Sequence, residues 1–398
     1  MTGSSFTNLP RVIEDGDNSL YDYPTPANVV GQGSFGSVFL VRRKVDSKVV
    51  ACKMQKHKPA KGRSASNLPG VREIKIWKRA CNSGISKHVV RLLDAAVHPA
   101  EGLTYCYMEY HQGGTLSSLS KAIHKTEAAI MHPVLLYHLA SEIALGLMEL
   151  HSRKILHLDL KSNNIVLTQP TLAAVNTTLM NMDIHPNFAA NNPGLVTSAL
   201  QILNTRPLAV LIDFTLSRDI SKEPADPSDP TDPHAKTMAA DGGRLYWSKS
   251  YQAPELVLMD KQTERADIYS FGVLLYQLCT RETPEYWGDM ERLPEVYERL
   301  QDVVDGCTEL MPWQRARLVT VTGRLLRLRQ EEMERVLTMV RKVSVRRSGM
   351  ETEESGESDW EDEEDVEDEK EDDRQDNGED CGKDSGKFFG DGDAGERQ

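Results

Sequence analysis

No uninterrupted apolar run in the 398-residue chain approaches the roughly 18 residues that span a membrane, so we expect no membrane partner. The first ten residues lack the basic and apolar regions of a signal peptide, and the six cysteines are scattered without a Cys-x-x-Cys pair. A disulfide scaffold and a zinc ribbon are therefore disfavoured. We expect a reducing compartment inside the cell, with cytoplasm and nucleus left open.

The charge is distributed unevenly along the chain. The formal net charge is −13, yet residues 351–398 hold 23 acidic and 5 basic residues, whereas residues 1–350 hold 37 acidic and 42 basic residues. A mildly basic body tolerates anionic ligands such as phosphates. With 39% apolar and 27% charged residues, the chain can bury a core, which excludes wholesale disorder.

Composition divides the chain into three parts. We expect a flexible leader over residues 1–20 and a disordered acidic tail over residues 348–398, where too little apolar surface is available to offset chain entropy. Between them, residues 21–109 favour short β-branched strands with one helix over residues 68–80. Residues 110–347 favour helices, because apolar residues recur there every three or four positions.

Two stretches interrupt the helical part. Residues 168–207 are rich in Asn, Thr, Ala and Pro with weak periodicity, and we expect them to form an inserted surface loop. Residues 224–233 repeat Pro and Asp, which block helix and strand alike. Residues 267–279, by contrast, are apolar nearly all round, which predicts a helix buried inside the domain.

A glycine-rich segment, GQGSFGSV, occupies residues 31–38. Such a turn lets backbone N–H groups approach phosphates closely, but a plain glycine-rich hairpin fits the segment equally well. The next element, with the sequence VACK at residues 50–53, is a strand. A dinucleotide-binding fold would have a helix there, so that fold is disfavoured.

Motifs further along the chain resemble those of the eukaryotic protein kinase family. The segment HLDLKSNN at residues 157–164 resembles the catalytic loop HRDLKxxN, and IDFT at residues 212–215 resembles the strand that ends in DFG. The segment APE at residues 253–255 resembles the end of the activation segment. This resemblance covers about residues 28–280 and implies an α+β, bilobal protein kinase fold, with a small β-rich N-lobe up to residue 109 and a larger helical C-lobe.

The same resemblance implies roles for individual residues. Asp159 would accept or orient the proton of the attacking hydroxyl, and Lys161 would neutralise charge on the γ-phosphoryl group of ATP. Lys53 would hold the α- and β-phosphates, with Glu73 in the following helix as its ion-pair partner.

The resemblance also implies a metal site and a nucleotide cleft. Asn164 and Asp213 would hold Mg²⁺, which prefers hard oxygen ligands. The remaining positions implied to surround ATP belong to the glycine-rich loop, the adenine sandwich and the hinge between the lobes: Gly31, Gly33, Ser34, Phe35, Gly36, Val38, Ala51, Met108, Glu109 and His111.

A lysine two residues after Asp159 is the family's serine/threonine pattern. The resemblance therefore implies a kinase that transfers the γ-phosphoryl group of ATP to Ser or Thr hydroxyls of protein substrates. Ser248 stands where the family has a threonine that bridges Asp159 and Lys161, and Arg335 is a candidate partner of Glu255. The rival hypothesis is a pseudokinase that serves as a nucleotide-binding scaffold.

Three features depart from the family pattern and indicate a divergent member. Leu158 replaces the catalytic-loop arginine that reads an activation-segment phosphate, so we expect activity that this phosphate does not gate. Thr215 replaces the glycine of DFG, and its β-branched side chain predicts a biased segment with Asp213 intact. The 49 positions from Asn164 to Asp213 contain the insertion.

The acidic tail has more than one interpretation. It is either a solubilising, self-repelling segment or a docking site for basic protein partners such as histones, and a third use is masking of the basic stretch at residues 315–347. Ser355 and Ser358 lie among acidic residues and resemble casein kinase type II sites. Nothing in the sequence indicates a nucleic-acid partner.

Overall fold

The computed structural model describes residues 11–14, 20–33, 36–57, 69–81, 86–125, 130–221, 249–257 and 262–353. Residues Met1–Gly349 form one compact unit, and the fold below is that of its described part. Predictions for Ser34, Phe35, Ser248, residues 224–233, most of the leader and the tail beyond residue 353 fall outside the described residues.

The described part of the N-lobe is built around a six-stranded sheet with the strand order β1-β5-β6-β4-β3-β2. The strands are β1 (Arg11–Glu14), β2 (Val29–Gly33), β3 (Gly36–Arg42), β4 (Val49–Lys56), β5 (Leu92–His98) and β6 (Leu103–Glu109). All neighbours are antiparallel except β1, which pairs with β5 in parallel. Since β1 lies within the expected flexible leader, that expectation is wrong for residues 11–14, whose backbone groups are paired with a sheet edge.

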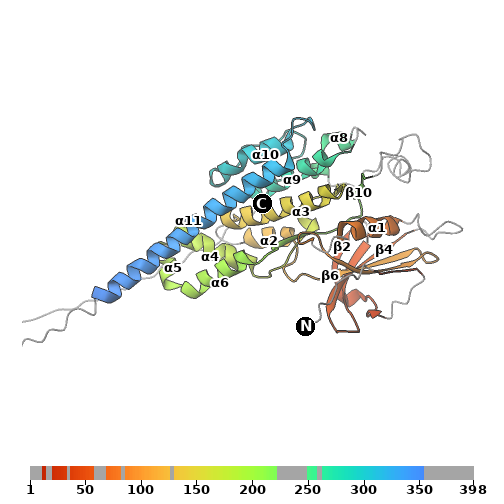
Figure 1. The fold of residues 1–398 in the computed structure, drawn as a ribbon, viewed down its shortest axis with the longest axis horizontal. Coiled ribbons are helices and arrows are strands. Elements are labelled where there is room, and N and C mark those ends of the chain that lie inside the picture. The colour runs from red at the N-terminus through yellow and green to blue at the C-terminus, as the bar shows by residue number, and fades with distance from the viewer. Residues whose placement is uncertain are drawn as a thin grey trace, which may run out of the picture. The chain divides into compact units, whose positions relative to one another are not determined.

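Helix α1 (Pro69–Cys81) confirms the helix that the sequence predicts in this lobe, and it packs against β5 (Figure 1). Its apolar side chains enter the core, where Ile74 and Trp77 are buried. The indole nitrogen of Trp77 donates a hydrogen bond to the carbonyl oxygen of Val90 (2.8 Å). A buried indole N–H needs such a partner, and this bond fixes α1 on the sheet.

The C-lobe is mostly helical, and its longer helices are α2 (Leu116–Ile123), α3 (Pro133–Ser152), α9 (Glu264–Thr280), α10 (Gln301–Thr308) and α11 (Leu318–Glu353). Helix α9 contains the predicted buried segment, and its side chains from Ala266 to Tyr276 are all buried. Helix α3 is long and apolar enough to cross a membrane by length and composition alone, but 83% of its apolar window is buried inside the protein. Its side chains therefore serve the C-lobe core.

Two short two-stranded sheets connect the segments that carry the kinase-like motifs. Strands β8 (Ile165–Leu167) and β9 (Ala209–Leu211) pair antiparallel, and so do β7 (Ile155–Leu156) and β10 (Arg218–Asp219). The 3-10 helix η4 (Ser162–Asn164) directly precedes β8. The 3-10 helix η5 (Lys249–Tyr251) and the helix α8 (Pro254–Val257) lie between β10 and α9 in the sequence. These pairings bring the segments around residues 159 and 213 side by side, because Ile165 is registered with Leu211.

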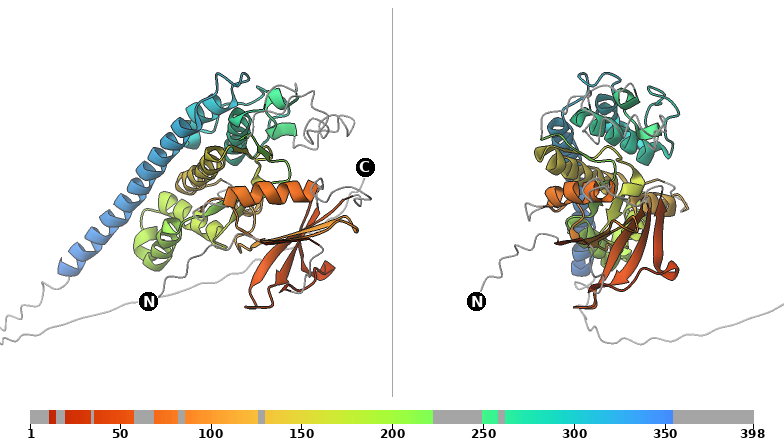
Figure 2. Two further views of the ribbon diagram at one scale, coloured as in Figure 1. Left: turned by 45° about the vertical axis from the view of Figure 1, so that its right-hand side comes forward. Right: turned by 90° about the vertical axis from the view of Figure 1, so that its right-hand side faces the viewer.

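The insertion is helical, so the expectation of a surface loop is wrong. It folds into α4 (Leu172–Ile184), α5 (Phe188–Asn191) and α6 (Pro193–Asn204). The reason is a partly hidden apolar spacing: the buried side chains of α4 include Leu172, Val175, Leu179 and Met182, which recur every three or four residues. Figures 1 and 2 show these helices beside α11.

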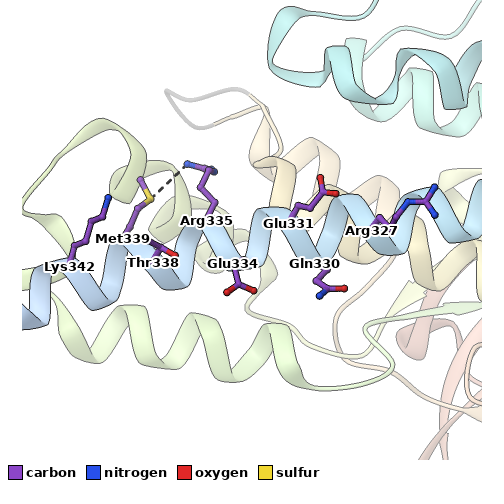
Figure 3. Close-up of a pocket in the computed structure, with 8 residues that line it drawn as sticks. All are labelled: Arg327, Gln330, Glu331, Glu334, Arg335, Thr338, Met339 and Lys342. Carbon is purple, nitrogen blue, oxygen red and sulfur yellow. Dashed lines mark hydrogen bonds between the residues drawn. The ribbon is translucent and has the colours of Figure 1, made fainter.

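The expected start of the tail also needs correction. Helix α11 continues to Glu353, whereas disorder was expected from residue 348. Extending a helix that is already formed costs less than nucleating one, so α11 runs on past the change in composition. A hollow of about 690 Å³ lies along one side of α11 and is lined by charged side chains that include Arg327, Glu331, Glu334, Arg335 and Lys342. Figure 3 shows these side chains on the helix. This lining carries both charge signs, and none of it belongs to the kinase-like motifs.

Candidate active site

Lys53 is placed by β4 and paired with α1. Its side chain is only 8% exposed, and its Nζ lies 2.8 Å from Oε1 of Glu73. Glu73 is 1% exposed. A buried lysine stays charged only when it is paired, and here burial acts to lower the pKa of Lys53 while the nearby carboxylates outweigh that effect and raise it. The site thus holds a permanent ammonium group.

Asp213 approaches the same ammonium from the segment that follows β9. Its Oδ1 lies 2.7 Å from Nζ of Lys53, and its backbone has a positive φ of 69°, which L-residues rarely adopt. Burial alone would raise the pKa of the Asp213 carboxyl, but the Lys53 charge holds it well below the usual range. Asp213 is therefore an ionised carboxylate at neutral pH.

The catalytic-loop motif closes into a compact set of contacts. Nζ of Lys161 lies 2.9 Å and 2.8 Å from the two carboxylate oxygens of Asp159. The side-chain amide of Asn164 donates to the backbone carbonyl and to Oδ2 of Asp159, both at 2.8 Å. The three residues that the sequence places in this loop are thus brought together, with the Asp159 carboxylate at the centre.

Asp267 of α9 anchors the backbone of the catalytic loop. Its carboxylate accepts hydrogen bonds from the backbone N–H groups of His157 (2.9 Å) and Leu158 (2.7 Å). Oδ2 also lies 2.8 Å from Nε2 of His151. Burial works to raise the pKa of Asp267, but these donors lower it on balance, so the anchor remains charged.

The strands that carry the predicted hinge and glycine-rich positions are neighbours in the N-lobe sheet. Ala51 of β4 is registered with Met108 of β6, and Val38 of β3 with Lys53. Gly36 has a φ of 145°, and a Cβ at this position would lie 2.3 Å from the carbonyl oxygen of Met54. Only glycine fits there, which explains one member of the motif.

The other cleft positions lie on the same strands. Gly31 and Gly33 belong to β2, Glu109 ends β6, and His111 follows it into the segment that leads to α2. Their placement agrees with a nucleotide held between the two lobes, whereas Ser34 and Phe35 lie outside the described residues.

The donor set around Asp213 fits a divalent cation bound together with phosphates. Among the described residues, the hydrogen bonds of the Asp213 carboxylate are all made by Oδ1, which leaves Oδ2 for a ligand. Asn164 bonds through its amide nitrogen, which leaves its amide oxygen. The described residues contain no cluster of three or more His, Cys, Asp or Glu side chains suited to a metal, so phosphate oxygens have to complete the shell.

Arg315, and not Arg335, is the partner of Glu255. The guanidinium of Arg315 lies 2.6 Å and 2.8 Å from the two carboxylate oxygens. Arg335 instead contacts Asp183 of the insertion (3.0 Å). The prediction of Arg335 is wrong because Arg315, in the connection between α10 and α11, reaches Glu255 of α8. Arg335 lies several turns into α11, where it contacts the insertion.

The sequence argument did not name Gln55, and it treated Thr215 only as a replacement for glycine, so the polar contacts of both residues were missed. Gln55 follows Lys53 by two positions in β4, and its amide nitrogen donates to Oε2 of Glu73 (2.6 Å). The hydroxyl of Thr215 lies 2.5 Å from Nζ of Lys53. The period of two in a strand, which places Gln55 on the face of Lys53, is a signal that reveals the first of them.

Comparison with known proteins agrees with this geometry. The family model described as "Protein kinase domain" matches residues 25–338. The chain is 25% identical over 280 residues to a serine/threonine-protein kinase Nek1 of Toxoplasma gondii, covering 68% of this chain and 14% of that protein. It is 25% identical over 291 residues to the serine/threonine-protein kinase atg1 of Schizosaccharomyces pombe, covering 69% and 30%.

A third relative is named as a dual specificity kinase. The chain is 27% identical over 264 residues to the human dual specificity testis-specific protein kinase 1, covering 65% of this chain and 32% of that protein. The chain thus spans less than a third of the length of these three relatives. The family match covers most of the chain and includes the residues of the candidate site. The chain therefore belongs to the protein kinase family, whose members use ATP and a divalent metal.

Proposed function

We propose that this protein transfers the γ-phosphoryl group of ATP to serine or threonine hydroxyls of proteins, with Mg²⁺ as the metal. The observation that carries the proposal is the convergence of Lys53, Glu73 and Asp213 in one cleft. They come from β4, α1 and the segment after β9, and Lys53 forms ion pairs of 2.8 Å with Glu73 and 2.7 Å with Asp213.

The residues of the catalytic loop have the chemistry that phosphoryl transfer needs. Asp159 would accept or orient the proton of a hydroxyl, and Lys161, which forms an ion pair with it, would neutralise charge on the transferred group. Asn164 and Asp213 would hold the Mg²⁺ ion, which neutralises phosphate charge when bound. Catalysis would then rest on positioning and charge neutralisation by preorganised groups.

Serine/threonine specificity is supported by Lys161 and by similarity to two serine/threonine-protein kinases. A dual specificity relative makes tyrosine transfer the outcome to test against it. The scaffold hypothesis is disfavoured because each catalytic position of the family is filled and the side chains meet.

Radiolabelled ATP, Mg²⁺ and a generic basic protein test the proposal. The wild-type chain is expected to label the substrate on serine or threonine, as read by phosphoamino-acid analysis. Asp159→Asn is expected to keep nucleotide binding and to lose transfer, and Lys53→Met to lose transfer as well. ATP binding by the wild type without any incorporation would establish the scaffold instead, and phosphotyrosine would overturn the specificity.

A further inference from the structure

The Glu73 carboxylate has partners besides Lys53. The amide nitrogen of Gln55 lies 2.6 Å from Oε2 of Glu73, and the hydroxyl oxygen of Thr215 lies 3.1 Å from the same atom. Gln55 and Glu73 are each 1% exposed. Inside the protein such bonds are strong, and an unpaired partner is costly. Side chains from β4, α1 and the segment after β9 therefore meet at one carboxylate oxygen.

The Thr215 hydroxyl lies at the centre of this cluster. Its oxygen is 2.5 Å from Nζ of Lys53 and 2.6 Å from Oδ1 of Asp213. A hydroxyl donates one hydrogen bond and accepts two. Since the ammonium can only donate, the Thr215 proton goes to a carboxylate, either that of Asp213 or that of Glu73.

The donors of Lys53 are fully used in this arrangement. An ammonium has three N–H groups, and here they face Oε1 of Glu73 (2.8 Å), Oδ1 of Asp213 (2.7 Å) and the hydroxyl of Thr215 (2.5 Å). A phosphate oxygen of ATP has to replace one of these acceptors. When the Thr215 hydroxyl donates to Oε2 of Glu73, it can release Lys53 and still hold Glu73, so the segment after Asp213 remains tied to α1.

Two other side chains of α1 also contact the segment that follows Asp213. Arg72 donates to the carbonyl oxygen of Ser217 (3.0 Å), and Arg79 forms an ion pair with Asp219. Leu158, by contrast, has no charge with which to couple a phosphate to the loop. The connection between α1 and the start of the activation segment is thus made by side chains already present in the chain.

We propose that Thr215 is a positioning residue of this kinase: its hydroxyl, together with the Gln55 amide, holds Glu73 and the segment that carries Asp213 in one arrangement around Lys53. The inference rests on the proposed function and adds to it a role for Gln55 and for the threonine that replaces the glycine of DFG. Threonine at this position then replaces backbone freedom with a polar tie between β4, α1 and the segment after β9.

The first test compares variants that keep or remove the hydroxyl. Thr215→Val has nearly the same shape without the hydroxyl and is expected to lower kcat/KM for ATP about tenfold. Thr215→Ser restores the hydroxyl and is expected to remain within about threefold of the wild type. Thr177→Val is the matched control, because Thr177 is exposed on α4 and its hydroxyl bonds only within that helix. Thermal unfolding of each variant reports whether it folds.

A double-mutant cycle separates a specific tie from a general structural role. Gln55→Met removes the second donor to the same carboxylate oxygen of Glu73, so its effect and that of Thr215→Val are expected to combine to less than the product of the two. Independent structural defects would multiply. Equal rates for Thr215→Val and the wild type, equal losses in the Val and Ser variants, or a simple product in the cycle would each overturn the inference.

A readout that needs no transfer keeps the inference distinct from the proposed function. Hydrogen exchange of the α1 amides is expected to be faster in Thr215→Val than in the wild type, and unchanged in Thr177→Val. If the wild type transfers no phosphate, the proposed function fails while this comparison still tests the tie. Unchanged α1 exchange in Thr215→Val would reject the tie even in an active kinase.

Discussion

Arg315 and Glu255 form a bidentate ion pair in the interior of the C-lobe, with side chains that are 0% and 4% exposed. The same guanidinium donates to the carbonyl oxygens of Glu309 (2.8 Å) and Arg265 (2.8 Å), and it lies 4.9 Å from the ring centre of Tyr269. The pair therefore joins α8, which ends the described part of the activation segment, to α9 and to the α10–α11 connection.

Arg315→Met is expected to destabilise the protein by about 3–5 kcal/mol, because it leaves the Glu255 carboxylate buried without its partner. Urea unfolding measures the change. Arg292→Met is the control: its ion pair with Glu298 has side chains 74% and 58% exposed, so the loss is expected to stay below about 1 kcal/mol. Equal losses in the two variants would contradict the assigned role of the buried pair.

A second prediction concerns pH and the buried His138 of α3. Its Nδ1 lies 2.7 Å from the carbonyl oxygen of Val134 and therefore carries the proton. Burial lowers the pKa of His138 from 6.5 to about 4, with a smaller contribution from Arg206 in the same direction. Between these values the unfolded chain binds a proton that the folded chain does not, so stability rises with pH across the window.

The expected loss on acidification from pH 6.5 to 4 is about 3 kcal/mol from this group, and it levels off below pH 4. The side chain introduced by His138→Gln cannot titrate, so the free energy of unfolding of the variant should fall less steeply over the same window. The difference in slope corresponds to at most one bound proton. Urea unfolding at a series of pH values measures both slopes. Identical slopes in the wild type and the variant would reject the prediction.

The sequence could predict the site where short motifs fix both residue type and local backbone. Each of four site residues lies in a short motif that can be recognised from the sequence alone: Lys53, Asp159, Asn164 and Asp213. The pairing of β8 with β9 brings the segments of Asn164 and Asp213 together. Gly36 belongs to such a motif too, although the contact that requires glycine there is made with the carbonyl oxygen of Met54 in the neighbouring strand β4. For such residues local chemistry determines the position.

Partner choice between distant segments was harder to predict. Arg315 and Arg335 both lie in a basic helical stretch, and only the path of the α10–α11 connection decides which of them reaches Glu255. The helices of the insertion were hidden because small and polar residues dilute their apolar spacing, although Val196, Ala199 and Leu203 of α6 still form one buried face. In both cases tertiary packing supplies what local preference leaves open.

A third prediction addresses the point where the insertion returns to β9. Glu142 of α3 is fully buried, and its Oε2 accepts hydrogen bonds from the backbone N–H groups of Leu208 (2.5 Å) and Ala209 (2.9 Å). Glu142→Ala leaves two buried donors without an acceptor and is expected to cost about 2–4 kcal/mol in urea unfolding. The rate of transfer should fall too, because β9 leads directly to Asp213.

Arg206→Ala serves as the control for this variant. Arg206 contacts the other carboxylate oxygen of Glu142 (3.2 Å) but is 33% exposed, so its removal is expected to cost less than about 1 kcal/mol. A larger loss for Arg206→Ala than for Glu142→Ala would mean that the ion pair, and not the backbone contacts, holds this connection.

The last prediction concerns Leu158, which stands where the family has an arginine. Its side chain is 7% exposed within an apolar cluster that also contains Leu156, Leu256 and Tyr269. No charge at this position can bind a phosphate, so phosphatase treatment is expected to leave the transfer rate unchanged. A loss of more than about tenfold on treatment would show that phosphorylation acts on this enzyme by another route.

Leu158→Arg tests whether the position tolerates the family's residue. The charge would have to enter the apolar cluster or disrupt it, so the free energy of unfolding is expected to fall by more than about 2 kcal/mol. Leu195→Arg is the matched control, because Leu195 is 55% exposed on α6 and the same change there should stay within about 0.5 kcal/mol. An arginine at position 158 that left stability intact and made the rate depend on phosphorylation would mean that Leu158 alone removed that control.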